Sequence, residues 1–457
     1  MRNFTALAWL PAGLFVIGMG AVGVLALGQV QTLPAGAGAI GKGPDALTLR
    51  GYEDVPRPPA FNDKKRAETA EQEKAVDNYT PQPAWAGQTR APKPAKIAAY
   101  EVQTAAEGLF SPWGFSFLPD GRILVSETGK GLRILDKNGR GGEYITGLPI
   151  DFSRRGQQLL DTIPDKDFSS NRVIYFLYRV PPPEAGDIGR REEDFPIHYP
   201  QIEMVGRGRL LPDDKSLTDV KVLLNTQGIE GRMIQAPDGT LFIDSGPLAG
   251  RGILSRNWTQ SQLPGSLMGK VLHINSDGSI PKDNPFIGRP DTRPEIWAFG
   301  VRDAQSMAFD ARGRLWTAEN GPMGGDELNL IQRGRNYGWP RASNGSNYDG
   351  SDIPDHRPGD GFEPPKVWWN PSISPASLII YSGGMFPQWR GDAIIGALSG
   401  EALIRVHLDG ENASKADQWP MGARIREVEQ APDGAVWLLQ DGPSGGRLLR
   451  LTPRRGS

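Results

Sequence analysis

The sequence contains no cysteine and only four histidines. Without cysteine the chain forms no disulfide, no cysteine-ligated zinc or iron–sulfur site and no thiol nucleophile. Four histidines leave little material for a metal site built from several imidazoles. Lys and Arg together number 51 against 53 Asp and Glu, which gives a net charge of −2. No excess of positive charge therefore points to nucleic acid as a partner.

Glycine and proline are plentiful. With 58 Gly and 40 Pro among 457 residues, they make up roughly a fifth of the chain, against about 12% in average proteins. Because these two residues end helices and form turns, the composition favours many short strands over long helices.

A long apolar run lies near the N-terminus. Arg2 precedes an uncharged stretch whose most apolar part is residues 6–27. As a helix this part would measure roughly 33 Å, enough to cross a bilayer core. It is longer than the apolar part of most signal peptides, although Ala26-Leu27-Gly28 offers a small-x-small cleavage site. We expect residues 1–30 to be a membrane anchor or, alternatively, a cleaved signal peptide, with the remaining chain in the periplasm.

Residues 31–98 have the composition of a spacer. Pro-rich segments at 51–60 and 81–96 flank a charged segment at 62–78 that has helical propensity but no apolar stripe. We expect this linker to hold the following domain, residues 99–457, away from the membrane.

A strand–turn–strand unit recurs from about Ala99 onward. Alternating apolar residues run into a Pro-Asp-Gly-like turn and then into an apolar strand, at residues 113–127, 232–244, 306–319 and 426–439. A looser copy spans 160–178, and a sixth unit without this turn spans 393–410. In such a turn Pro fixes φ, Asp bonds to the backbone and Gly accepts positive φ. Repeated hairpins are typical of an all-β propeller, and the length allows six to eight blades.

Several segments resemble the PQQ-dependent sugar dehydrogenases, the soluble glucose and aldose/sorbosone dehydrogenase family. They include Arg293-Pro-Glu-Ile-Trp-Ala-Phe-Gly-Val-Arg-Asp303, Glu319-Asn-Gly-Pro-Met-Gly-Gly-Asp-Glu-Leu-Asn329 and Gly334-Arg-Asn-Tyr-Gly-Trp-Pro340. The resemblance covers roughly residues 108–453 in the family's order. It implies a six-bladed propeller that transfers a hydride from a sugar C1 hydroxyl to PQQ, with Ca²⁺ polarising the quinone and a separate electron acceptor.

The resemblance also implies roles for individual residues. Arg302 matches an arginine that contacts the quinone, so we expect it to act in catalysis and to bind the cofactor. Asp303 stands where the family usually has Asn, and we expect it to bind the cofactor as well. The backbone carbonyls of Gly321 and Pro322 match the ligands of Ca²⁺, and Asp326 with Glu327 matches an acidic pair in the same loop. We also expect Arg232 and Arg405 to bind the cofactor.

The catalytic base of the family is missing. Where the family has His-Phe-Gly-Gly-Arg-Leu, this chain has Gly228-Ile-Glu-Gly-Arg-Met233. Glu230 is a candidate substitute base, and its alternative is an ion pair with Arg232. We therefore expect a sugar dehydrogenase of reduced or lost activity, or alternatively a non-catalytic propeller that binds a protein partner or glycan. A lactonase-like hydrolase is a third reading, but no metal ligands in the sequence support it.

Other residues leave alternatives open. Arg302 and Asp303 could form a salt bridge at a blade edge. Trp368 and Trp369 could line a sugar site or pack between blades. The acidic loop at 349–355 lacks EF-hand spacing, which favours a solvated loop over a Ca²⁺ site. None of the histidines, at positions 198, 273, 356 and 407, aligns with the family's base.

Overall fold

The computed structural model describes residues 89–90, 100–154, 156–181, 202–226, 228, 231–246, 258–347, 352–441 and 445–454. The apolar run at 6–27 and most of the predicted spacer lie outside these residues, so both expectations stay predictions. Among the residues described, no helix is long and apolar enough to cross a membrane.

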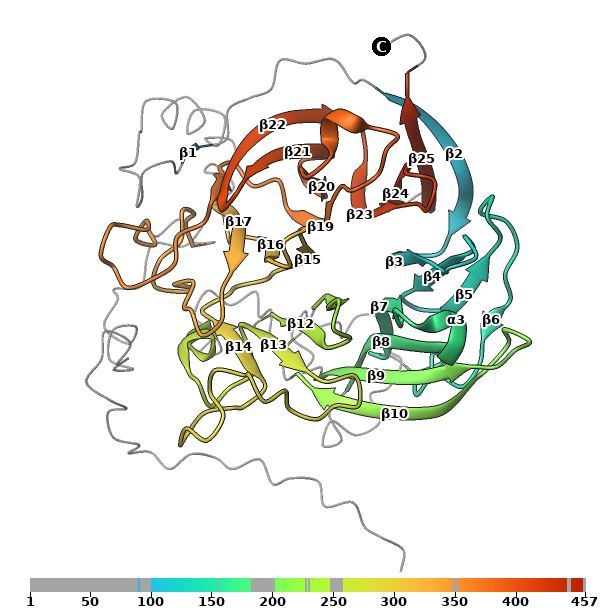
Figure 1. Cartoon of the computed structure of the whole chain (residues 1–457), viewed down its shortest axis with the longest axis horizontal. Coiled ribbons are helices and arrows are strands. Elements are labelled where there is room, and N and C mark those ends of the chain that lie inside the picture. The colour runs from blue at the N-terminus through green and yellow to red at the C-terminus, as the bar shows by residue number, and fades with distance from the viewer. Residues whose placement is uncertain are drawn as a thin grey trace, which may run out of the picture. The chain divides into compact units, whose positions relative to one another are not determined.

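Six antiparallel sheets surround a central axis (Figure 1), which confirms the all-β, six-bladed propeller. The innermost strands of neighbouring blades pack against one another around this axis. From the innermost strand outward, blade one is β3 (Pro112–Phe117), β4 (Ile123–Glu127), β5 (Gly131–Leu135) and β6 (Tyr144–Ile145), and blade two is β7 (Gln158–Pro164), β8 (Val173–Val180), β9 (Ile202–Leu210) and β10 (Leu217–Asn225). Blade three is β11 (Met233–Gln235), β12 (Leu241–Ser245), β13 (Lys270–Ile274) and β14 (Ile296–Phe299), and blade four is β15 (Ser306–Phe309), β16 (Leu315–Glu319), β17 (Asp326–Ile331) and β18 (Val367–Trp369). Blade five is β19 (Pro375–Ile380), β20 (Ala393–Ala397), β21 (Ala402–Asp409) and β22 (Asn412–Pro420), and blade six is β23 (Arg424–Gln430), β24 (Val436–Asp441), β25 (Gly446–Pro453) and β2 (Tyr100–Leu109).

The last blade joins the two ends of the propeller. Its outermost strand, β2, begins the predicted propeller domain and pairs with the last strand, β25. Within the predicted spacer, β1 (Thr89–Arg90) adds a parallel edge strand to β18 of blade four. Within the described ranges there are three short helical segments, α3 (Phe168–Asn171), η4 (Trp258–Gln262) and η5 (Pro387–Trp389).

The predicted turns connect the first and second strands of their blades. In all four, the Gly has φ between +74° and +93°, at Gly121, Gly239, Gly313 and Gly434. The turn aspartates bond the backbone as expected, since Asp433 Oδ1, for example, accepts from the Ala435 amide at 3.0 Å. The sixth unit, at 393–410, instead forms the second and third strands of blade five.

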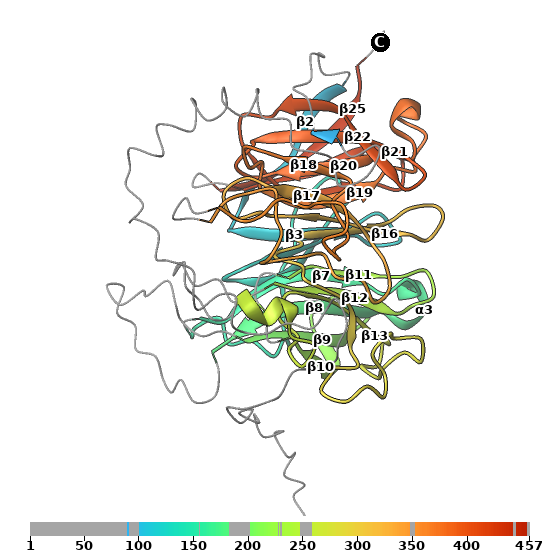
Figure 2. The ribbon, with the colours of Figure 1, turned by 90° about the vertical axis from the view of Figure 1, so that its left-hand side faces the viewer.

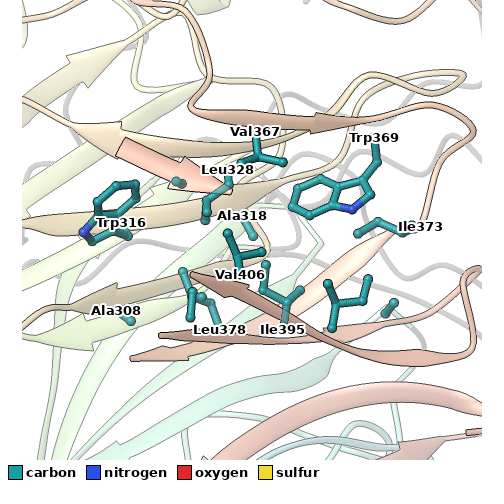
Figure 3. Packing of buried hydrophobic residues seen from close by; sticks show 14 of the residues in the cluster. Ala308, Trp316, Ala318, Leu328, Val367, Trp369, Ile373, Leu378, Ile395 and Val406 are labelled. Atoms are coloured by element: carbon teal, nitrogen blue, oxygen red, sulfur yellow. The ribbon is translucent and has the colours of Figure 1, made fainter. Parts of the chain in front are cut away.

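The hydrophobic core is divided among the blade interfaces. Six clusters of buried side chains each lie between two neighbouring blades. Between blades four and five, Trp316 and Trp369 pack with aliphatic residues from both sheets (Figure 3). Trp369 is therefore a core residue of this interface, and Trp368 is also buried.

The antiparallel strands give the propeller two faces with different connections. We call upper the face that carries the loops from second to third strand and from one blade to the next. The lower face carries the turns from first to second and from third to fourth strand. Figure 2 shows the blades from the side, with connections at both ends of the strands.

Candidate functional site

Two adjoining loops of the upper face carry the predicted residues Arg302, Asp303, Gly321 and Pro322. The first two lie between β14 and β15, and the other two lie between β16 and β17. The loops are joined by hydrogen bonds, because the Asn320 amide donates to the Asp303 carbonyl at 2.9 Å. Arg302 Nη1 donates to the Asn320 carbonyl at 2.7 Å. The structure thus brings these four residues together.

The half-buried side chain of Arg302 is held in place by its surroundings. Its backbone amide donates to Glu319 Oε1 at 2.6 Å, and its guanidinium lies 5.3 Å from the centre of the Trp339 ring. A cation over an indole face is stabilised by the ring quadrupole. Arg302 is therefore a preorganised cation beside the loop of Gly321.

The loop of Gly321 and Pro322 is closed by Asp326. One carboxylate oxygen accepts from the Gly321 amide at 2.8 Å. The other accepts from the Ser372 hydroxyl and from the amides of Ile373 and Ser374, at 2.6–2.8 Å. A side chain at Gly321 would clash with the Gly324 and Gly325 backbone, so this turn requires glycine.

The acceptors of this turn are the backbone carbonyl oxygens of Gly321 and Pro322. No hydrogen bond among the residues described ends on the carbonyl of Gly321 or Pro322. Backbone carbonyls are frequent ligands of Ca²⁺. The chemistry of the turn therefore fits the predicted cation, with backbone rather than side-chain oxygens.

Buried carboxyl groups surround the same loops. Burial raises the pKa of Glu319 to about 8, and it raises the pKa of Glu327 and of Asp244 well above the usual range. Asp303 and Glu319 add to the shift at Asp244 by charge repulsion. A cavity of about 10 Å³ between Arg302, Glu319 and Glu327 has room for about one water. In the described part of the chain no three acidic or histidine side chains converge on one metal position.

Arg232 lies on the axis of the propeller. It immediately precedes β11 and is 4% exposed. Its guanidinium forms ion pairs with Glu427 and, at 3.4 Å, with Asp161. It also donates to backbone carbonyls at 3.0–3.4 Å, those of Trp113, Gln305, Ala376 and Arg426. These partners belong to all five other blades, so the donors of Arg232 are used to join the blades.

Arg405 lies apart from Arg302. It is on the third strand of blade five, where it donates to Asp392 at 2.7 Å and to Asp417 at 2.5–2.8 Å. It also donates to the Gln388 carbonyl. Because Asp392 immediately precedes β20, this ion-pair network lies toward the lower face. The structure does not bring Arg405 to the predicted cofactor residues.

Other arginines gather at the centre of the upper face, around the ring of Trp113 at the start of β3. Three guanidinium carbons lie within 4.6–6.0 Å of the ring centre, those of Arg426, Arg179 and Arg232. Arg424 and Arg426 both donate to Asp441, at 2.7 and 2.5 Å. Burial lowers the pKa of Arg426, and the charges of Arg232 and Arg424 contribute to this. Sequence reasoning missed this cluster, although the i, i+2 spacing of Arg424 and Arg426 on a strand indicates that both side chains lie on one face.

Gly228 occupies a tight position before β11. Its amide donates to Thr226 Oγ1 at 3.2 Å, and its φ is not positive. A Cβ here would clash with Ser245 and with the Gly246 carbonyl. The backbone therefore leaves no room for a side chain where the family has its histidine. Glu230 lies outside the described residues, and its role as a base stays a prediction.

The described histidines lie in three different places. His356 is buried near the site, with Nε2 3.9 Å from Glu327 Oε1. His407 contacts Asp392 at 2.8 Å in blade five, and His273 lies on β13 in blade three. His198 and part of the acidic loop at 349–355 lie outside the described residues.

The sequence of the chain is similar to a protein family and to several known proteins. Residues 109–450 match the family described as glucose/sorbosone dehydrogenase. The chain is 33% identical over 371 residues to the aldose sugar dehydrogenase YliI of Escherichia coli, covering 78% of this chain and 94% of that protein. It is 26% identical over 426 residues to quinoprotein glucose dehydrogenase B of Acinetobacter calcoaceticus, covering 76% and 86%.

A solved structure supports the same assignment. The PQQ-bound aldose sugar dehydrogenase of Streptomyces coelicolor is 26% identical and superposes with a TM-score of 0.58, covering 79% of this chain and all of that one. The family match covers most of the chain and the fold agrees with it. The chain therefore belongs to the glucose/sorbosone dehydrogenase family.

Proposed function

We propose that this protein oxidises an aldose or related sugar with PQQ and Ca²⁺ bound on the upper face. The observation that carries the proposal is the position of Arg302, which donates to the Asn320 carbonyl next to Gly321 and Pro322. Within the described part of the chain, no hydrogen bond ends on the carbonyls of these two residues. Membership of a sugar dehydrogenase family and the PQQ-bound relative support it. When bound, PQQ would accept a hydride from the sugar C1 and Ca²⁺ would polarise the quinone.

The charges of the upper face fit such a cofactor. PQQ carries three carboxylates, and arginine is the side chain best suited to bind carboxylate in two-point contacts. Arg302, Arg424 and Arg426 supply guanidinium groups there, and Arg426 is crowded by like charges that an anion would relieve. We assign cofactor binding to these three arginines, and we assign the joining of blades to Arg232 and an ion-pair role within blade five to Arg405.

The position of the base sets the expected activity. A positioned general base contributes about 10²–10⁴-fold in rate, and Gly228 has no side chain to serve as one. Electrostatic stabilisation by Arg302 remains available. The proposal is therefore slow sugar oxidation, with Glu230 as the candidate proton acceptor.

A non-catalytic role is the second candidate, and the crowding at Gly228 favours it. In that case the upper face would bind a protein partner or glycan without turnover.

We also propose that the propeller is periplasmic and membrane-anchored, or exported with a cleaved signal peptide, because the N-terminal run of the sequence is apolar. A soluble product beginning near Gln29 would contradict the anchor.

Calorimetric titration of the purified full-length chain with PQQ, with and without Ca²⁺, tests the cofactor. We expect saturable binding that is weaker in a chelator, followed by slow, sugar-dependent dye reduction. Binding without dye reduction would support the non-catalytic role. Absence of PQQ binding in the presence of Ca²⁺ would contradict the dehydrogenase proposal.

A further inference from the structure

A separate cavity of about 500 Å³ lies between blades three and four. Its walls include the Pro237–Asp238 turn, the β15–β16 turn and the last residues of β17. These segments belong to the lower face, opposite Arg302 and Gly321. The volume is within the range of small-molecule sites, roughly 300–1,000 Å³.

Aromatic rings form one wall of this cavity. The imidazole of His273 stacks on Phe242, with ring centres 4.2 Å apart and planes at 20°. Trp297 meets both rings edge-on, at 5.3 Å from Phe242 and 4.9 Å from His273. Trp297 is half-buried and lines the cavity, so part of its indole is accessible to a ligand.

The hydrogen bonds of Asn284 fix the tautomer of His273. Asn284 Nδ2 donates to the carbonyls of His273 and Pro294, at 2.9 and 2.7 Å. Its Oδ1 must therefore accept, and it lies 2.6 Å from His273 Nδ1. The proton is consequently on Nδ1, and Nε2 carries a lone pair.

That lone pair has no partner. His273 is 3% exposed, and no hydrogen bond within the described structure ends on Nε2. Burial lowers the pKa of His273 and so favours the neutral ring. A buried acceptor without a donor costs free energy, and a hydroxyl group from a ligand in the cavity would satisfy it.

Three charged side chains of the cavity wall are held by neighbouring groups. Arg314 forms an ion pair with Asp310 at 2.7 Å, and Arg333 Nε donates to the Asp283 carbonyl at 2.5 Å. Asp238 accepts from the Thr240 hydroxyl at 2.7 Å. The cavity thus offers an aromatic surface and an acceptor on His273, and the carboxylates of Asp283 and Glu411 on its wall disfavour an anionic ligand.

We propose that this cavity binds a neutral sugar ring, which stacks on Trp297 and donates a hydroxyl hydrogen bond to His273 Nε2. A sugar combines an apolar C–H face with hydroxyl donors, and this combination matches the two features of the wall. The site does not involve Arg302, Gly321 or Pro322, so it does not depend on the proposed dehydrogenase reaction.

The test titrates the purified full-length chain with D-glucose, maltose and cellobiose, in the absence of PQQ and Ca²⁺. At least one sugar should bind with Kd below about 10 mM. His273→Asn keeps a donor for Asn284 and removes the acceptor at the position of Nε2, and it should weaken binding about 3–10-fold, the value of one hydrogen bond. Trp297→Ala should weaken binding about 10-fold.

Two control variants separate this site from the upper face. His407→Asn makes the same change on an exposed histidine of blade five, and Arg302→Ala alters the proposed cofactor site. Both should bind the sugar as the natural chain does. Loss of binding in Arg302→Ala, with retention in Trp297→Ala, would overturn the proposal.

A measurement on the natural chain covers the case in which the variants do not fold. Sugar should shift the Nε2 nitrogen resonance of His273 and leave that of His407 unchanged. No binding of any of the three sugars, or no shift at His273, would overturn the proposal whether or not PQQ binds to the upper face.

Discussion

The guanidinium of Arg232, in blade three, forms an ion pair with the carboxylate of Glu427, in blade six, across the axis of the propeller. Through its other bonds the same side chain reaches the remaining four blades. Because the Arg232 side chain is buried, its hydrogen bonds to the other blades are stronger than they would be in water.

Replacing Arg232 with Met should lower the free energy of unfolding by about 3–5 kcal/mol, because Glu427 and Asp161 would remain buried without their cation. Urea unfolding measures the change. Arg209→Met removes a surface pair with Asp219 and should cost less than about 1 kcal/mol. Equal small effects from both substitutions would contradict the axial role.

Glu429, on β23, lines a cavity of about 420 Å³ that also contacts Arg232 and Asp161, and it should make stability depend on pH. Burial raises its pKa to about 8, and Asp161 adds to the shift. The native state then holds a proton that the unfolded state has lost, so the free energy of unfolding falls as pH rises from about 4.5 to 8 and levels off above. Glu429→Gln should make this slope shallower, whereas exposed Glu411→Gln should not. An unchanged slope in Glu429→Gln would show that other groups account for it.

Restoring the family's histidine at Gly228 should not restore activity. The new side chain would clash with Ser245 and the Gly246 backbone, so we expect Gly228→His to lower the melting temperature without raising dye reduction. Gly384→Ala is the control, because its Cβ would make only an ordinary contact with Arg390. A well-folded Gly228→His variant with about 10²-fold faster turnover would instead show that a missing base is the one defect.

Asp326→Asn should loosen the turn that presents Gly321 and Pro322. An amide nitrogen would replace one of two oxygens that accept four hydrogen bonds, and stability should fall by about 1–3 kcal/mol. Hydrogen exchange at the Gly321 and Ser374 amides should accelerate. The control Asp219→Asn, at an exposed residue, should leave the exchange rates of these amides unchanged. If the same amides exchange as slowly in Asp326→Asn as in the natural chain, the role of the carboxylate is refuted.

The propeller could be predicted because its signals are local. Each Pro-Asp-Gly turn fixes a hairpin within a few residues, and the positive φ of Gly121 and Gly239 follows from the same short pattern. The Arg302 loop and the Gly321 loop could be assigned to one cofactor site because each lies in a continuous segment that resembles the family.

Assignments that depend on distant parts of the fold were not predictable. Nothing near Arg232 in the sequence indicates that its partners come from five other blades. The strand of Arg405 was predicted, but its bonds to Asp392 and Asp417 depend on strand register. The arginines around Trp113 come from positions up to 247 residues apart, and only the closed propeller brings them together.

The most direct test of the account is the affinity for PQQ, in the presence of Ca²⁺, of two arginine variants. Arg302→Ala should weaken binding by about 1–3 kcal/mol, because a charge-assisted contact is lost. Arg405→Ala should leave the affinity unchanged, since its guanidinium is held by Asp392 and Asp417. Unchanged affinity in Arg302→Ala, or a loss confined to Arg405→Ala, would contradict a cofactor site built on Arg302 and the Gly321–Pro322 turn.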